Sequence, residues 1–445
     1  MSPSRRTFLR AGAVATGVLA AGPLRALEAL AADSVEDGAE PVEALATGNA
    51  GYGPLKAAGA HLELPEGFWY VRFGAAGDKM SNGKPTPNYH DGMAAFAGPG
   101  GTIRLVRNHE VDGKKGAFAG SPYDATAGGG TTNLVFDPQA AKLVATYPSL
   151  VGTVRNCAGG PTPWGSWITC EETTVGLDHG YRMPHGYCFE VPAGAVGPVK
   201  ALPLRAMGRF IHEAVCVDPY SGIVYETEDR PSAGFYRFLP KTKNVLAAGG
   251  ALQMLAIKGW WKADLRRSQH PGAWLPVTWV DIPDPDHRNA GLNPSEVFEQ
   301  GLWRGGAMFG RLEGCFWHNN GPWSGAWIVS TDGGDAGLGQ VWWYDAANSR
   351  IKLVYESRSA VGLRQPDNVT VSPRGALLLC EDGEGSRDRL KGLSHGTLFD
   401  FARNRGSNGE FAGATWSPDG RWLFVNIQRP AATYAITGPW GRGPL

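Results

Sequence analysis

The stretch 156–174, NCAGGPTPWGSWITCEETT, brings one thiol close to two adjacent carboxylates. Cys157 stands beside two glycines, and a short apolar strand at 166–170 leads directly into Glu171 and Glu172. A carboxylate buried at the end of such a strand is costly unless it is paired or bound to a cation. The stretch therefore indicates a cation site, with a strand that simply runs out into solvent as the alternative.

Further acidic residues follow apolar strands elsewhere in the chain. Residues i and i+2 of a strand face the same side, so Glu110 shares a face with Asn108, and Arg311 shares one with Glu313. Glu226 shares a face with Glu228 in the same way, and further acids stand at Glu213, at Asp367 and at Glu381-Asp382. Glu171 and Glu172 are neighbours, so both reach one site only if a bulge or a strand end interrupts the alternation.

This ligand set predicts the kind of cation. Many carboxylates with few imidazoles favour hard cations such as Ca²⁺, Mn²⁺ or Fe³⁺, and Cys157 can add a thiolate to an iron. The sequence has no HxH or HExxH spacing, no Walker A motif and no Gly-x-Gly-x-x-Gly opening a helix. These absences argue against a zinc protease and a nucleotide-binding fold.

The elements that must position these residues are short strands. The chain has 63 glycines and 32 prolines among 445 residues, many aromatics and little helical periodicity. An apolar residue, then Asp or Ser, then Pro recurs before apolar strands at 136–138, 217–219, 371–373 and 416–418. The last two prolines are 418 − 373 = 45 residues apart, about one propeller blade.

We therefore predict an all-β chain folded as a β-propeller of about six blades. The innermost strands of a propeller line one central channel, so acids carried by several blades converge there. Five or six carboxylates in one channel cannot all stay ionised without cations. The metal site is accordingly expected in the central channel. Residues 244–284 and 386–408 are interpreted as long or partly helical insertions.

The N-terminus is similar to a twin-arginine export signal. Arg5-Arg6 is followed by Phe8-Leu9, an alanine-rich apolar run and an Ala-x-Ala site at 29–31. We predict a signal peptide at 1–31, a linker at 32–60 and a single propeller domain at 61–440. The expected partner during export is the twin-arginine (Tat) translocase, and the expected location is periplasmic or secreted, with no membrane span after cleavage.

Charge excludes some partners. The whole chain has a formal net charge of +0, and removing residues 1–31 takes away four arginines and one glutamate, which leaves 0 − 3 = −3. Such a chain has no electrostatic basis for binding nucleic acid. We expect a monomer that acts on a small molecule.

The six cysteines contain no Cys-x-x-Cys pair, which argues against a zinc ribbon or a thioredoxin-like site. Proteins exported by the twin-arginine route generally fold before they reach an oxidising space. We therefore interpret most of these cysteines as small core residues. Cys188 in particular is expected to lie apart from any acidic cluster.

Eight short motifs occur in a fixed order: RNHE at 107–110, NCAGG at 156–160, WGSW with CEE at 164–172, GRFIHE at 208–213, YETED at 225–229, RLEG at 311–314, PDN at 366–368 and WSPDG at 416–420. In this order they resemble the PhoX family of calcium-dependent alkaline phosphatases. The resemblance spans residues from about 60 to 430. The chain is shorter than is usual in that family, so peripheral insertions that shape the substrate pocket are expected to be missing.

The resemblance implies a propeller with a mixed iron and calcium cluster that hydrolyses phosphate monoesters outside the cytoplasm. It implies metal ligation by Cys157, Glu171, Glu172, Glu213 and Glu313, and phosphate binding by Arg311. Glu110, Glu228, Asp367 and Glu381 are weaker candidate ligands. The cofactors implied are Ca²⁺ and Fe³⁺.

Two other functions fit the same residues. Another calcium-dependent propeller hydrolase, such as a lactonase, would use a few Asn, Asp or Glu ligands and no cysteine. A binding module would keep the metals structurally and turn nothing over. Iron content separates the first alternative from a phosphatase, and a phosphatase assay with calcium separates the second.

Overall fold

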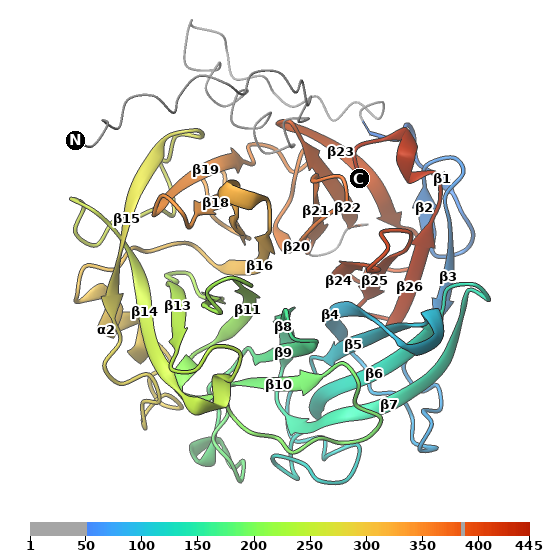
Figure 1. Cartoon of the computed structure of the whole chain (residues 1–445), viewed down its shortest axis with the longest axis horizontal. Coiled ribbons are helices and arrows are strands. Elements are labelled where there is room, and N and C mark those ends of the chain that lie inside the picture. Colours follow the sequence, from blue (N-terminus) through green and yellow to red (C-terminus); the bar gives the residue numbers. More distant parts are fainter. Residues whose placement is uncertain (1–50, 384–387) are drawn as a thin grey trace, which may run out of the picture.

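The strands of the computed structural model, which describes residues 51–383 and 388–445, form a ring of sheets around a central channel (Figure 1). The strands nearest the channel are β4 (His90–Ala97), β8 (Asn156–Pro161), β11 (His212–Val217), β16 (Leu312–His318), β20 (Pro366–Val371) and β24 (Phe411–Trp416). We call these six the inner strands. This arrangement confirms the all-β propeller.

Two sheets lie next to each other early in the chain. One has the order β4, β5 (Ile103–His109), β6 (Gly129–Asp137) and β7 (Lys142–Thr153). The other has the order β8, β9 (Ser166–Glu171) and β10 (Cys188–Pro192). All neighbours are antiparallel, so each blade is a meander that runs outward from the channel.

The next sheet contains two blades. It runs from β11 through β12 (Val224–Glu228), β13 (Phe235–Pro240), β14 (Gly250–Ile257) and β15 (Trp274–Asp281), then through β19 (Arg350–Glu356), β18 (Gln340–Asp345) and β17 (Gly325–Ser330) to β16. Strand β15 pairs with both β14 and β19, so within the described residues the six blades form five hydrogen-bonded sheets. A helix, α2 (Glu296–Leu302), lies on the connection between these two blades.

The two ends of the described chain close the ring. The last blade has the order β24, β25 (Leu423–Ile427), β26 (Ala432–Thr437) and β3 (Trp69–Phe73), so its outer strand comes from the N-terminal side. The neighbouring sheet has the order β20, β21 (Leu377–Glu381), β22 (Arg389–Ser394), β23 (Thr397–Asn404), β2 (Leu62–Leu64) and β1 (Lys56–Ala57). These pairings join the start of the described chain to its end.

Two predictions about the organisation of the chain are wrong, one about a linker and one about insertions. The linker prediction fails at residues 51–60, because β1 pairs with β2 and the Tyr52 hydroxyl bonds the backbone of Trp440 and Leu445. The segments 244–284 and 386–408 are not insertions, since they contain β14, β15, β22 and β23. The rest of the predicted linker and the predicted signal peptide lie outside the described residues.

Each inner strand carries an irregularity near its start. The first residue of the inner strand pairs with the last residue of the second strand of its blade, and after a register shift the pairing resumes at the fourth residue, or at the fifth residue in β24. Such a bulge bends a strand and redirects one side chain. In five strands the second residue lies in the shift: Asp91, Cys157, Glu213, Glu313 and Asp367. In β24 the second residue, Ala412, still pairs with Asn426.

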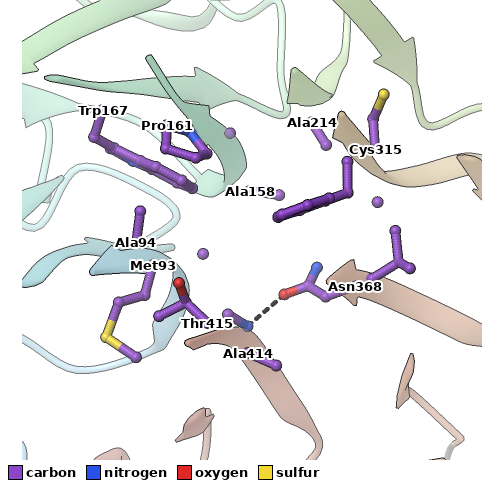
Figure 2. Close-up of a pocket in the computed structure, with 16 residues that line it drawn as sticks. Met93, Ala94, Ala158, Pro161, Trp167, Ala214, Cys315, Asn368, Ala414 and Thr415 are labelled. Carbon is purple, nitrogen blue, oxygen red and sulfur yellow. Dashed lines mark hydrogen bonds between the residues drawn. The ribbon is translucent and has the colours of Figure 1, made fainter. Parts of the chain in front are cut away.

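The third residue of each inner strand is small or an amide: Gly92, Ala158, Ala214, Gly314, Asn368 and Gly413. The inner strands approach too closely for larger groups. A Cβ added to Gly314 would lie 2.7 Å from the carbonyl oxygen of Asp367, and one added to Gly92 would lie 2.7 Å from the Cα of Ala158. These residues line a narrow pocket in the channel, where the Asn368 side chain accepts a hydrogen bond from the Gly413 amide (Figure 2).

Candidate metal centre

Two clusters of potential ligands lie in the channel. The first consists of Glu213, Glu313 and Asp367, whose ligand atoms lie within 4.8 Å of one another. The second consists of Glu110, Cys157 and Glu172, with the same spacing. We call them the carboxylate triad and the thiol triad. The Cys157 thiol donates to the Glu213 Oε1 at 3.1 Å, so the two triads are in contact.

The fold explains why residues distant in sequence meet here. Each channel ligand is either the second residue of an inner strand or the first residue after the second strand of a blade. Glu110 directly follows β5 and Glu172 directly follows β9. Because the first residue of each inner strand pairs with the last residue of the second strand, these two positions lie side by side at the end of every blade.

Burial raises the pKa values of the carboxyls in this cluster. Burial raises the pKa of Glu213, Glu313 and Glu172 well above the ordinary value, and neighbouring carboxylates raise it further. Burial, followed by the charge of Asp382, raises the pKa of Asp367 to about 8. The carboxyls cannot all be ionised at neutral pH unless cations compensate them.

Unpartnered atoms point to the same conclusion. Among the described residues, Oδ1 of Asp91 and Oε2 of Glu213 are buried without a hydrogen-bond partner. A buried polar atom without a partner is destabilising. The oxygen-rich set with a single thiolate fits hard cations together with an iron, so these residues suit the cofactors that the sequence implied.

Two arginines border the triads. Arg311 donates from Nε and Nη2 to the Asp229 carboxylate at 2.7 and 2.8 Å, and Nη2 also reaches Glu313 Oε1 at 3.1 Å. The side chain of Arg311 remains 34 % exposed, so a small molecule in solvent can reach it. Arg155 lies 3.9 Å from Glu110 and 3.7 Å from Glu172.

The structure does not bring Glu171, Glu228 and Glu381 to the triads, although the sequence suggested them as ligands. Each is the last residue of a second strand, and its carboxylate accepts backbone amides of nearby loops. Glu171 accepts from Val154 and Gly186, Glu228 from Gly234, and Glu381 from Arg364 and Arg389. Glu171 also lies 2.6 Å from the His185 ring.

Several channel residues were not among the sequence candidates: Asp91, Asp229, Asp382, Glu410, Arg155 and Gln428. Asp229 and Asp382 directly follow the glutamates that were chosen, so a one-residue change in the assumed strand end would have found them. Gln428 occupies the same position after β25 and donates to Glu110 at 2.7 Å and to Asp91 at 3.2 Å. Asp91 had no local signal, because it is the second residue of β4 and does not follow an apolar strand as the chosen glutamates do.

A family model described as alkaline phosphatase PhoX matches residues 50–145 and 132–431. The chain belongs to the PhoX family. It is a phosphatase, and the resemblance seen in the eight motifs is confirmed. No curated protein matches the chain significantly. No helix among the described residues is long and apolar enough to cross a bilayer.

A solved PhoX structure shares the fold of this PhoX family member. It is the structure of Pseudomonas fluorescens PhoX in complex with vanadate, a transition state analogue. The match covers 87 % of this chain and 98 % of the Pseudomonas chain, with a TM-score of 0.66 and 15 % sequence identity. The Xanthomonas campestris gluconolactonase XC5397 covers 86 % of this chain and 99 % of that chain, with a TM-score of only 0.40 and 12 % identity.

Proposed function

We propose that the chain is a metal-dependent phosphatase that hydrolyses phosphate monoesters, with its active site at the two triads in the channel. The observation that carries this proposal is the convergence of Cys157, Glu213, Glu313 and Asp367 from four successive inner strands onto one buried cluster. Family membership supplies the reaction class. The channel position and the partly exposed Arg311 supply a place for a substrate.

Glu213, Glu313 and Asp367 would hold calcium, and Cys157 with Glu110 and Glu172 would hold iron. Bound there, these cations would neutralise charge and act as Lewis acids toward a phosphoryl group. Phosphoryl transfer depends mainly on positioning and on compensation of negative charge. The residues of the chain must therefore orient the substrate and supply further positive charge beside the cluster.

Arg311 is the residue that we propose for phosphate binding. Its Nε and Nη2 already face Asp229 and Glu313, which leaves Nη1 as the guanidinium nitrogen for a phosphate oxygen. Asp229 holds the guanidinium plane by a two-point contact, so the orientation of Arg311 is set before a substrate arrives. A two-pronged grip of Arg311 on phosphate would require breaking this contact.

The test is an assay of the purified full chain with p-nitrophenyl phosphate, with and without calcium, together with elemental analysis of the same sample. We expect calcium-supported hydrolysis, iron in the protein and loss of activity in prolonged EGTA, because chelation leaves the acids uncompensated. Full activity in metal-stripped protein would refute metal dependence. Lactone hydrolysis without phosphatase activity would favour the lactonase alternative.

Export by the twin-arginine route is part of the same proposal. The motif that supports it, Arg5-Arg6, lies outside the described residues. Replacing both arginines by lysine should retain the phosphatase in the cytoplasmic fraction, and activity measured in separated fractions checks this. Equal activity outside the cytoplasm for the variant and the parent would contradict this route.

A further inference from the structure

Besides the two triads, a third group of potential ligands lies outside the channel, between two blades. Cys188 of β10, His212 of β11 and Glu226 of β12 are fully buried, and their ligand atoms lie within 4.8 Å of one another. Cys188 Sγ is 3.5 Å from His212 Nδ1, which is 3.4 Å from Glu226 Oε2. Cys188, which was expected to lie apart from any acidic cluster, therefore has one acidic neighbour, Glu226.

A second thiol stands beside this group. Cys170 of β9 is the direct cross-strand partner of Cys188, and the two sulfur atoms are 3.6 Å apart. Both thiols are fully buried. With Cys170 included, the group contains two sulfurs, one imidazole nitrogen and one carboxylate, and we call it the inter-blade cluster.

The carboxylate of Glu226 has no hydrogen-bond partner among the described residues. Both of its oxygens are buried and unpartnered, which is destabilising for a side chain with 0 % exposure. The neighbouring glutamate of the same strand does not share this feature. Glu228, two residues further along β12, is bonded by the Gly234 amide and the Tyr236 hydroxyl.

The ring of His212 is arranged as metal-binding imidazoles are. Its Nε2 lies 3.2 Å from the Gly208 carbonyl oxygen, which can only accept, so Nε2 carries the proton. The lone pair of Nδ1 then faces Glu226 and Cys188. Metal-bound histidines usually fix their tautomer by such a bond from the other nitrogen. His212 Nδ1 and the Glu226 carboxylate both accept hydrogen bonds, and they face each other and the Cys188 thiol. A cation or additional protons must therefore lie between these groups.

The spacing fits a tetrahedral zinc ion. Zinc binds sulfur at about 2.3 Å, nitrogen at about 2.0–2.1 Å and carboxylate oxygen at about 2.0–2.2 Å, so ligand atoms around one zinc lie about 3.3–3.8 Å apart. Two separations within the group of Cys188, His212 and Glu226 fall in this range: 3.5 Å from Cys188 Sγ to His212 Nδ1, and 3.4 Å from His212 Nδ1 to Glu226 Oε2. Sulfur and imidazole ligands with one carboxylate favour zinc over calcium or magnesium.

We propose that Cys188, His212 and Glu226 bind a structural Zn²⁺ ion. Cys170 lies beside Cys188 but outside this group of mutually close atoms, so its side chain turns toward the ion to become the fourth ligand. The site is closed, because its surroundings are apolar and the Phe210 ring lies 3.6 Å from the His212 ring, centroid to centroid. The ligands come from two sheets, β8–β10 and the sheet that begins at β11, so the ion joins adjacent blades. The proposal does not depend on the proposed function.

Elemental analysis and cobalt substitution of the folded full chain test the site. We expect about one zinc per chain to remain after dialysis against EGTA. A buried site with four ligands binds zinc much more tightly than surface sites, which lose their zinc to the chelator. Cobalt in this site should give visible bands and a thiolate-to-cobalt absorption. The Cys157→Ala variant should keep these bands, which excludes the thiol triad as their source.

Two variants remove ligands, and each has a matched control. Cys188→Ala should abolish the thiolate-to-cobalt absorption, and Cys380→Ala, at an equally buried cysteine, should retain it. Glu226→Gln preserves size and should weaken zinc binding at least about tenfold, because a ligand is lost. Glu228→Gln, on the same strand and equally buried, should bind zinc like the parent.

The results distinguish a zinc site from a disulfide and from a metal-free histidine–carboxyl contact. A Cys170–Cys188 disulfide in the non-reduced peptide map of the parent would overturn the proposal, because oxidised sulfurs do not bind zinc. Folded parent protein without zinc and without thiolate-to-cobalt bands would also overturn it. Such a result would leave a neutral imidazole beside a protonated carboxyl, because burial lowers the pKa of His212 and raises the pKa of Glu226. Equal zinc affinity of Glu226→Gln and Glu228→Gln would exclude Glu226 as a ligand.

Discussion

The thiol of Cys157 and the carboxylate of Glu213 lie 3.1 Å apart, although 56 residues separate them in the sequence. Both are second residues of inner strands, β8 and β11, so the repeated bulge turns them toward each other. Burial raises the pKa of the Cys157 thiol well above its ordinary value, and the charges of Asp91 and Glu213 raise it further. A cation between the two residues would reverse this effect and favour the thiolate.

Replacing Cys157 by alanine should therefore remove iron and any visible thiolate-to-iron absorption. The carboxylate triad keeps its oxygens, so we expect calcium content to fall less than iron content. Elemental analysis and absorption spectra of the purified variant provide the measurement. Cys216→Ala is the matched control, because Cys216 is buried and contacts Cys315 at 3.0 Å instead of the triads. Equal iron in Cys157→Ala and the parent would remove Cys157 from the ligand set.

Metal-stripped protein should lose stability as the pH rises. Asp367 has an ordinary pKa of 3.8 and a folded pKa of about 8. A carboxyl whose pKa is raised by folding stabilises the protein fully below the lower value, and this contribution is lost as the pH rises toward the upper one. We expect the Tm in EGTA to fall by several degrees between about pH 5 and about pH 8, as measured by thermal melts.

Two comparisons check this pH dependence. Asp367→Asn removes the titrating group, so its metal-stripped Tm should change less with pH than that of the parent. Calcium should flatten or reverse the slope in the parent, because a bound cation favours ionised ligands. A metal-stripped parent whose Tm rises over this pH range would contradict the assigned direction of the Asp367 pKa.

The sequence predicted the fold and the chemistry of the site better than the individual ligands. Turn residues, apolar strands and acids at strand ends were enough to predict a propeller with an acidic channel. The choice between Glu171 and Glu172, or between Glu228 and Asp229, depends on the residue at which the strand ends. A side chain changes face with each residue, so an error of one position exchanges a channel ligand for a residue that binds loop amides.

The bulges explain the remaining differences. Alternation alone cannot show that the second residue of each inner strand turns into the channel, because the register shift breaks the period of two. Arg311 shows the same limitation. It precedes β16 with a φ of +22°, so it reaches Glu313 from outside the strand and not as its i−2 neighbour on a regular face. Contacts between blades, such as Arg311 with Asp229, have no local sequence signal.

Glu171 and Glu172 should respond differently to the same substitution. Glu172→Gln removes a member of the thiol triad, so we expect lower metal content and lower activity with little loss of stability in metal-free protein. Glu171→Gln leaves the triads intact and weakens the bonds from Val154, Gly186 and His185. The expected cost is about 1–3 kcal/mol in unfolding free energy, because buried bonds to a charged acceptor are lost.

Urea unfolding and elemental analysis of both variants check this difference. Adjacent positions and an identical chemical change make the two variants controls for each other. Loss of metal in folded Glu171→Gln with unchanged metal in Glu172→Gln would mean that the channel uses the opposite residue of the pair.

Arg311→Lys should impair catalysis while the metal content stays near the parent value. Lysine keeps the positive charge but cannot bond Asp229 at two points and present a further N–H to phosphate. A contact that strengthens as charge spreads over the transferring phosphoryl group acts mainly in the transition state. We expect a loss of roughly 10²-fold in kcat/KM for phosphomonoesters and weaker inhibition by inorganic phosphate.

Asp229→Asn separates binding by Arg311 from its positioning. The guanidinium stays in place but loses its charged partner, so we expect a smaller loss in kcat/KM than in Arg311→Lys and a measurable weakening of phosphate inhibition. If Arg311 served only as an ion-pair partner that supports the fold, both variants would lower the Tm and leave the kcat/KM of the folded fraction unchanged. Kinetics, phosphate inhibition and metal content measured on the same samples distinguish the two roles, and unchanged phosphate inhibition in Arg311→Lys would remove Arg311 from the active site.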